Sequence, residues 1–293
     1  MIVDLPEHYR QEDVLSFHGR DAMGVSETVD GDSLRKGIVW RGTPGCLTLS
    51  FAKGRVAADL HLDGRKRPAD EAGLREMVHR MLGLTQPVEQ FESAYRGHSQ
   101  IGRLIARHPG LRLPVAASPF EALTWAVTGQ QISVGAAVSI RRKLIRGAGA
   151  AHSSGLLCYP DAAAVSVLSE DDLRSAGFSQ TKARTVLEIS RRVTDGRLPL
   201  EDWLTGADMK LVGERLREVP GIGPWTVSYS LLRGYGWLDG SLHGDVAVRR
   251  GLQSLLGSAE KIDEKAAERW LAAFRPWRAL VGAHLWAWTS VQA

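Results

Sequence analysis

Apolar and polar residues alternate along the first part of the chain in the manner of β-strands. Between about Ser26 and Leu62, β-branched and aromatic residues recur in GIVWRG and CLTLSFAKGRVAADLHL, with Gly or Pro between the runs. The alternation is clearest in the second run. Apolar residues then recur at helical spacing over residues 71–82, which predicts a helix. The first hundred or so residues therefore predict a small α+β unit with an antiparallel sheet.

The pattern changes between His108 and Phe120, where three prolines interrupt the helical periodicity on either side. We place a domain boundary here, near residue 112, and expect an N-terminal α+β domain over residues 1–112 and an all-α region over residues 113–293. Three candidate N-cap residues mark helix starts in the second region: Ser118, Ser169 and Asp245. The sequence therefore predicts an α+β fold that is mostly α-helical.

Composition narrows the class of protein. The 293 residues are 44% hydrophobic and 24% charged, which is typical of soluble globular proteins. No apolar run approaches the roughly 18 residues of a membrane helix, and the N-terminus lacks the order of a signal peptide, so we expect a cytoplasmic location. Only Cys46 and Cys158 are present, too few for a Cys-ligated zinc site or an iron–sulfur cluster. The net charge of +4 permits a polyanionic partner without requiring one.

A Gly/Pro-rich turn, VPGIGPWT over residues 219–226, separates two helical patterns. Pro220 ends the first helix, and Pro224 suits the first turn of the next one. Gly221 and Gly223 can adopt conformations that residues with side chains avoid, and they leave the N–H groups at the helix start open to close approach. Because the positive end of the helix dipole lies there, the turn can bind a phosphate. The alternative is a tight connection between two packed helices.

VPGIGPWT, followed by LRGYGWLDGSLHGDVAVRRGL, resembles the helix-hairpin-helix DNA repair glycosylases, whose signature is a Gly/Pro-rich hairpin with an Asp on a following loop. HPGLRLPVAASPFEALTWAVTGQQIS and PWRALVGAHLWAW resemble stretches of the AlkA-type branch, the 3-methyladenine DNA glycosylase II family. The resemblance covers nearly the whole chain and is strongest from His108 onward. It implies two helical subdomains flanking a cleft, and a monofunctional enzyme that flips alkylated bases such as 3-methyladenine and 7-methylguanine out of double-stranded DNA and hydrolyses the N-glycosidic bond. No cofactor, membrane or obligate protein partner is implied.

Asp245 directly precedes an apolar-periodic run that begins at Val246, which makes it a natural N-cap. A carboxylate at a helix N-terminus is stabilised by the dipole and by backbone N–H groups, and it can in turn stabilise a sugar cation. In the resembling family this Asp is the catalytic group. It either stabilises an oxocarbenium-like sugar electrostatically or orients the attacking water, and the sequence leaves both roles open. Asp239, in the same loop, is the second candidate.

Three aromatic residues, Trp225, Tyr229 and Trp286, match positions that surround the flipped base in that family. Trp225 and Tyr229 are four residues apart and therefore share one helix face. Electron-rich rings attract a cation such as an alkylated purine, although an aromatic residue at helical spacing is more often part of a core. Relatives with lyase activity carry a lysine where this chain has Trp225, so the resemblance implies base removal without strand cleavage.

The resemblance also implies which residues hold the DNA. Gln131, in TGQQIS, matches the residue that fills the gap left by the flipped base, the alternative being a plain connection between two helices. Phosphate contacts are expected from the backbone at Gly221 and Gly223, from the Thr226 hydroxyl and from Arg249. No catalytic metal is expected. A monovalent ion that bridges to phosphate is an optional feature of three hairpin carbonyls, those of Arg217, Val219 and Ile222.

Two other functions compete with this interpretation. A non-catalytic helix-hairpin-helix protein would bind DNA through the hairpin backbone alone, but it needs neither Asp245 nor the aromatic set. An oxidised-base glycosylase with lyase activity is disfavoured by Trp225 at the lysine position and by the scarcity of cysteines.

Overall fold

The structure is a computed structural model that describes residues 1–290. Its N-terminal part contains an antiparallel sheet in the order β1-β5-β4-β3-β2. The strands are β1 (Ile2–Asp4), β2 (Glu27–Asp30), β3 (Ser33–Trp40), β4 (Thr43–Ala52) and β5 (Arg55–Leu62). The predicted strands are thus present, and the GIVWRG and CLTLSFAKGRVAADLHL runs form the three long central ones. The edge strand β2 lies within the range predicted to have β character, whereas the three-residue edge strand β1 lies outside it.

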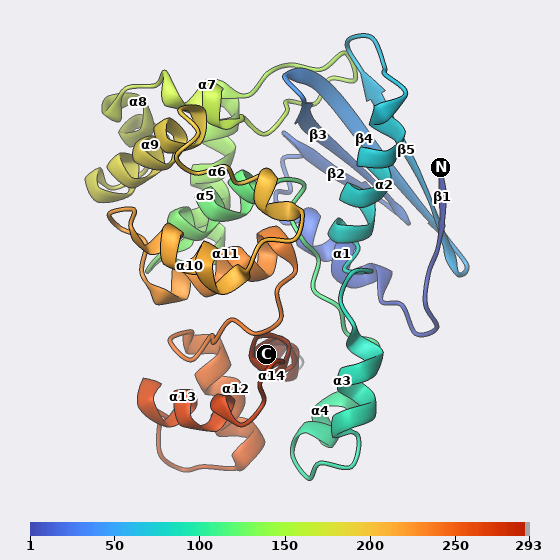
Figure 1. Cartoon of the computed structure of the whole chain (residues 1–293), viewed down its shortest axis with the longest axis vertical. Helices are drawn as coiled ribbons and strands as arrows, with labels where there is room; N and C mark the ends of the chain where they lie inside the picture. Colours follow the sequence, from blue (N-terminus) through green and yellow to red (C-terminus); the bar gives the residue numbers. More distant parts are fainter. Residues whose placement is uncertain (291–293) are drawn as a thin grey trace.

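One face of the sheet packs against helix α2 (Ala69–Met81), as Figure 1 shows. Along β5 buried and exposed residues alternate, so that Val56, Ala58 and Leu60 point into the core. Leu74 and Val78 of α2 belong to the same hydrophobic cluster. The short helix α1 (Gln11–His18) contributes to this cluster as well.

The rest of the described chain is helical. The helices before the hairpin are α3 (Val88–Tyr95), α4 (Ile101–Arg107), α5 (Pro119–Gly129), α6 (Val134–Ala148), α7 (Ala162–Ser166), α8 (Glu170–Ala176), α9 (Gln180–Thr194), the 3-10 turn η1 (Asp202–Leu204) and α10 (Met209–Arg217). Those after it are α11 (Pro224–Tyr235), α12 (Val246–Leu256), α13 (Glu264–Ala272) and α14 (Arg278–Ser290). The predicted caps are present: the side chains of Ser118, Ser169 and Asp245 each accept a backbone N–H at the start of α5, α8 and α12. None of the described helices is long and apolar enough to cross a membrane.

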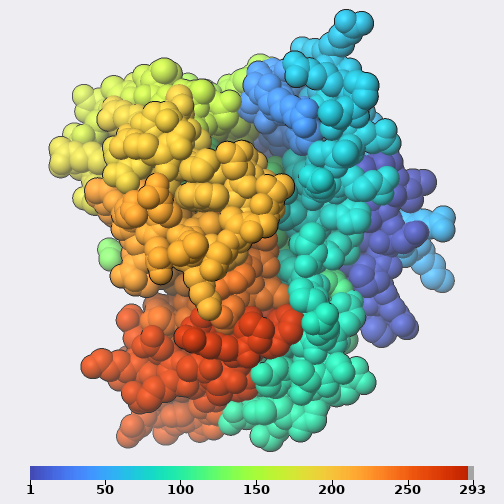
Figure 2. All heavy atoms as spheres, viewed as in Figure 1, coloured from blue at the N-terminus to red at the C-terminus, as the bar shows by residue number. Residues whose placement is uncertain are grey.

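Two hydrophobic clusters organise the helices. One contains residues of α5 to α11. The other joins α3 and α4 to α12, α13 and α14, with Phe91 and Leu104 packed in the same core as Leu252 and Leu280. Figures 1 and 2 show these segments together at the lower end of the molecule. The boundary near residue 112 stays a prediction, and a core that combines helices from before and after it is a feature that periodicity alone does not reveal.

A buried ion network links the sheet to the helices. Lys36 of β3 is fully buried, and its Nζ binds Glu27 of β2 and, at 2.8 Å, Glu121 of α5. Arg141 of α6 lies 3.0 Å from Glu27 and 2.7 Å from Glu121. His18 Nδ1 lies 2.8 Å from the same Glu27. Burial opposes ionisation of Glu27, but Arg141 and Lys36 outweigh it and hold its pKa well below the usual range.

Candidate active site

A cleft of about 1160 Å³ lies between the two helical clusters. Its walls come from the α5–α6 turn, the hairpin before α11, α11 itself, the start of α12 and the end of α14. Its volume is somewhat above the roughly 300–1,000 Å³ of small-molecule pockets. All nine residues predicted for catalysis, base binding or DNA contact line it: Gln131, Gly221, Gly223, Trp225, Thr226, Tyr229, Asp245, Arg249 and Trp286.

The two hairpin glycines differ in conformation. Gly221 has φ +89°, which residues with side chains rarely adopt, and a Cβ added there would lie 2.1 Å from Thr185 Oγ1. Gly223 is the N-cap of α11 with φ −92°, an ordinary value, and a Cβ there would meet no heavy atom within 4 Å. Only Gly221 therefore needs to be glycine for the fold. The open space at Gly223 leaves the N–H groups at the start of α11 accessible from the cleft.

The Asp245 carboxylate is held by four N–H donors. Oδ1 accepts hydrogen bonds from the backbone N–H groups of Ala247 (2.9 Å) and Val248 (3.1 Å), and from Trp286 Nε1 at 3.1 Å. Oδ2 accepts from Trp225 Nε1 at 3.0 Å. The donors match an ionised carboxylate, which can only accept. Three of the four use Oδ1, so the remaining acceptor capacity lies on Oδ2.

The three predicted aromatic residues form a continuous wall next to Asp245. The rings of Trp225 and Tyr229 stack with centroids 5.1 Å apart, as their spacing on α11 requires, and Trp286 of α14 lies 6.3 Å from Tyr229. Trp125 of α5 extends the wall, and its Nε1 donates a hydrogen bond of 3.1 Å to the Tyr229 hydroxyl. The structure therefore brings together the carboxylate and the rings that the sequence suggested as partners.

Gln131 projects from the short turn between α5 and α6. It is exposed and has φ +55°, uncommon for a residue with a side chain. Two neighbours hold this turn in place. Lys182 Nζ donates to the carbonyls of Thr128 (2.9 Å) and Gln130 (2.7 Å), and Gln130 Nε2 donates to Gly221 O (3.0 Å). The candidate wedge is thereby tied to the hairpin.

The remaining predicted residues take different positions. Thr226 is buried, and its hydroxyl accepts a 2.9 Å hydrogen bond from Gln130 Nε2 while keeping its own proton for another acceptor. Arg249 of α12 reaches the cleft, and its buried Nε has no hydrogen-bond partner among the described residues. The Val219 carbonyl accepts the Ile222 N–H at 3.1 Å, and the ion site at the hairpin carbonyls stays a prediction. Asp239 is not among the described residues that line the cleft, and its side chain accepts a 2.7 Å hydrogen bond from Arg278 Nε.

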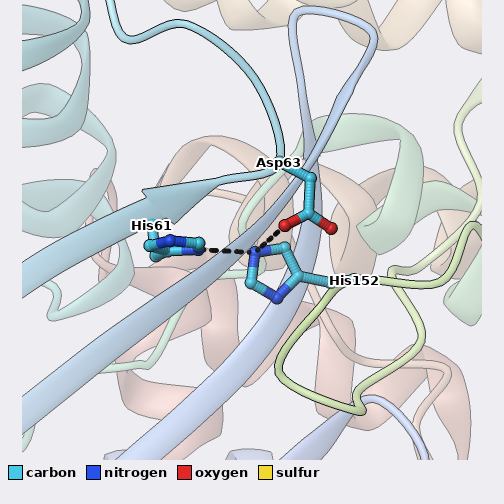
Figure 3. A group of neighbouring side chains, drawn as sticks. All are labelled: His61, Asp63 and His152. Carbon is cyan, nitrogen blue, oxygen red and sulfur yellow. Dashed lines mark hydrogen bonds and ion pairs between the residues drawn. The ribbon is translucent and has the colours of Figure 1, made fainter.

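A His/Asp group lies outside the cleft, where the end of β5 meets the α6–α7 loop (Figure 3). His61 Nδ1 lies 3.1 Å, and Asp63 Oδ1 3.4 Å, from His152 Nε2. The Ser154 N–H donates to His152 Nδ1 at 3.0 Å, so the proton of the neutral ring is on Nε2 and points at its two neighbours. A metal bound at Nε2 would displace that proton. We therefore interpret the group as a hydrogen-bonded contact between the sheet and the loop.

Sequence reasoning missed four residues of the site: Trp125, Gln130, Lys182 and Arg233. Gln130 and Lys182 act through contacts across about 50 to 90 residues of sequence, which spacing does not reveal. The position of Arg233, in contrast, could have been inferred from the sequence. It lies four residues after Tyr229 and eight after Trp225, so the three share one face of α11 in an otherwise apolar stretch.

Comparisons with known proteins show the family to which the chain belongs. Residues 124–276 match the family described as HhH-GPD superfamily base excision DNA repair protein. The chain is similar to DNA-3-methyladenine glycosylase 2 of Escherichia coli, with 28% identity over 188 residues. That alignment covers 64% of this chain and 63% of the E. coli protein, less than two thirds of its length.

Solved structures show the same fold over the whole length. The 3-methyladenine DNA glycosylase of Archaeoglobus fulgidus superposes with a TM-score of 0.86 at 20% identity, covering 100% of this chain and 99% of that one. A DNA-bound 8-oxoguanine glycosylase/lyase of Clostridium acetobutylicum gives a TM-score of 0.75 at 14% identity, covering 100% and 98%. Because the fold occurs in glycosylases named with and without lyase activity, the chemistry has to be argued from the site.

Proposed function

The chain belongs to the HhH-GPD superfamily of base excision DNA repair proteins, and from this premise we propose that it is a monofunctional DNA glycosylase acting on alkylated bases in double-stranded DNA. The observation that carries the proposal is the Asp245 carboxylate, which is bound by the Trp225 and Trp286 indoles inside an aromatic cleft. A DNA-binding module without catalysis has no use for this arrangement.

The reaction breaks the bond between the sugar C1′ and the base nitrogen. The bonding electrons leave with the base, so an alkylated purine that begins as a cation departs as a neutral molecule. The sugar becomes oxocarbenium-like, and Asp245 Oδ2, whose acceptor capacity is unfilled, stabilises that charge. Water adds to C1′ and releases a proton, which leaves an abasic site. No cofactor or general acid is needed to balance the step.

The cleft lining supports base removal without strand cleavage. A lyase needs a primary amine to attack the sugar, and no lysine is among the described residues that line the cleft. Trp225 stands at the family's lysine position and is engaged with Asp245. In the proposal Gln131 fills the gap in the stack, while the start of α11, Thr226 and Arg249 hold the phosphates.

The test measures release of 3-methyladenine and 7-methylguanine from methylated duplex DNA, separately from strand cleavage. We expect Asp245→Asn to lower the release rate by about a hundredfold or more. The matched control is Asp263→Asn, because Asp263 caps α13 by the same kind of bond and is not part of the described cleft lining. Asparagine caps helices as well as aspartate does, so both variants should fold.

The outcomes separate the candidate functions. Undiminished release by Asp245→Asn would refute the role of the carboxylate. Duplex binding by the wild type with no base released would favour the non-catalytic alternative. Nicking of the strand by the wild type, without added alkali, would favour the lyase alternative.

A further inference from the structure

The Tyr229 hydroxyl is a buried donor without an acceptor. Tyr229 is 9% exposed and lines the cleft. Its oxygen accepts the 3.1 Å hydrogen bond from Trp125 Nε1, and an indole N–H can only donate. No described residue accepts the proton of the hydroxyl. Because buried polar groups normally have hydrogen-bond partners, this proton is left for an acceptor that enters the cleft.

Arg233 is a second donor beside the same hydroxyl. It is 8% exposed, lies one turn beyond Tyr229 on α11, and interacts electrostatically with that residue. A guanidinium has only donors. Burial lowers the pKa of this one to about 10, so it is charged at neutral pH. Arg233 therefore cannot take the hydroxyl proton, and its positive charge polarises the O–H bond toward donation.

The acidic residues near this wall are already engaged. A small cavity of about 40 Å³ shares Trp125 and Arg233 with the cleft. Its three carboxylates, those of Asp21, Glu27 and Glu121, are each paired with other cations. No described carboxylate lies within ion-pair distance of Arg233. The acceptor that the hydroxyl lacks therefore has to come from a ligand.

The position of Tyr229 on α11 indicates which part of the DNA reaches it. The start of the helix is the proposed phosphate site, and Trp225, close to that start, binds the carboxylate proposed to act at the sugar. Tyr229 lies one turn farther from the hairpin, about 6 Å along the helix axis. After the phosphate and the sugar, the base is the next part of a flipped nucleotide. The missing acceptor is then a ring nitrogen or a carbonyl oxygen of that base.

We propose that the Tyr229 hydroxyl donates a hydrogen bond to an acceptor atom of the flipped base, and that Trp125 is a positioning residue that keeps the hydroxyl proton directed into the cleft. The inference rests on the proposed function. When the bond to C1′ breaks, its electron pair stays with the base, which gains one unit of negative charge whether it began as a cation or as a neutral molecule. A hydrogen bond to the base therefore strengthens as the bond breaks, and this lowers the barrier. The proton stays on the tyrosine oxygen, so the hydroxyl is not a general acid.

The experiment measures the single-turnover rate of base release, at saturating enzyme, from a duplex that contains one 7-methylguanine. Affinity for the same duplex is measured separately. The variants are Tyr229→Phe, Trp125→Phe and the double variant, which keep an aromatic ring at each position but remove the hydroxyl, the indole N–H or both. The rate constant at saturating enzyme does not depend on the fraction of enzyme that is folded, so partial misfolding does not affect the comparison.

The chain offers a matched control for each substitution. Tyr235→Phe removes a hydroxyl from the same helix, one that donates to the Leu200 carbonyl at 3.0 Å. Trp288→Phe removes an indole N–H that donates to the Ser254 hydroxyl at 3.1 Å, the same kind of bond at the same length as that of Trp125. Neither Tyr235 nor Trp288 is part of the described cleft lining. Both controls should release the base at the wild-type rate.

We expect Tyr229→Phe to lower the release rate by about tenfold, and Trp125→Phe by about threefold, from the net value of hydrogen bonds to charged and to neutral groups. Duplex affinity should change little, because the bond strengthens only in the transition state. The double variant should be no slower than Tyr229→Phe, because Trp125 acts through the hydroxyl. An indole that only packs would instead slow release by the same factor in both backgrounds.

Two results would overturn the proposal. One is a wild-type release rate in Tyr229→Phe. The other is a loss in Trp125→Phe that recurs in full when Tyr229 is already phenylalanine. If Trp125→Phe does not fold, Trp125→Leu takes its place with the same two outcomes. A wild type that releases no base from this duplex would instead refute the proposed function.

Discussion

The hairpin glycines allow the fold and the binding of phosphate to be tested separately. Gly221→Ala places a methyl group 2.1 Å from Thr185 Oγ1 and forces a side chain into a backbone with φ +89°. The strained backbone costs about 1–2 kcal/mol. The Thr185 hydroxyl donates to the Pro220 carbonyl at 2.9 Å, and loss of that hydrogen bond costs about 1 kcal/mol more. The free energy of unfolding should therefore fall by about 2–3 kcal/mol, which lowers the Tm by roughly 4–12 °C.

Gly223→Ala should leave the stability of the fold nearly unchanged but weaken DNA binding. Its φ of −92° suits alanine and its Cβ meets open space, so the loss is that of a modest N-cap, below about 1 kcal/mol. The same methyl group would stand where a phosphate has to approach the N–H groups of α11. We expect affinity for an undamaged duplex to fall by about tenfold, given the net value of hydrogen bonds to charged groups.

The assay pairs thermal unfolding with fluorescence anisotropy on a labelled duplex at one fixed salt concentration. The control is Gly147→Ala, because Gly147 lies on α6, has open space at its Cβ and is not part of the described cleft lining. It should change neither DNA affinity nor the fold. If Gly223→Ala binds DNA as tightly as the wild type, no phosphate is held at this helix start, and the hairpin is only a connection between helices.

Further predictions concern the carboxylate, the wedge, acid stability and the His/Asp group. Trp286→Phe removes one donor to Asp245 and should slow base release by about tenfold in a single-turnover assay. Lys182→Met should weaken duplex affinity in a titration, because the turn before Gln131 loses two hydrogen bonds. Because the folded-state pKa of Glu27 is lowered, its contribution is complete above about pH 5 and is lost as pH falls through that pKa, so the Tm should decline below about pH 4. Zn²⁺ should not raise the Tm, whereas His152→Ala should lower it.

The parts of the site that could be predicted are those in which sequence spacing fixes geometry. Trp225 and Tyr229 share a helix face because they are four residues apart, and Asp245 caps α12 because it directly precedes an apolar-periodic run. The hairpin was predictable from its prolines and glycines. Each of these features depends on a few neighbouring residues.

The parts that could not be predicted depend on contacts between distant segments. Nothing near Arg233 in the sequence indicates that it lies against Phe17, more than 200 residues earlier, or that nearby carboxylates are paired with other cations. Lys36 lies two residues from both Leu34 and Ile38, so the strand period places it on their buried face, but the sequence does not reveal that Glu27 and Glu121 neutralise it there from two other elements. The sequence of α3 likewise shows an amphipathic helix but not the helices it packs against.

The hydrogen bonds of Asp245 constrain its role more than the sequence did. Oδ1 accepts hydrogen bonds from two backbone N–H groups and from Trp286 Nε1. These three bonds use the acceptor capacity of Oδ1. Electrostatic stabilisation of the sugar and orientation of water must therefore both use Oδ2, which accepts from Trp225 alone among residues 1–290. One oxygen cannot contact C1′ and hold a water against the same face of the sugar at once. If Oδ2 faces C1′ directly, the water attacks from the other face or after the base has left; if Oδ2 holds the water, the carboxylate acts on the sugar through it. The stereochemistry at C1′ in methanol-containing buffer, where methanol replaces water, distinguishes the two arrangements.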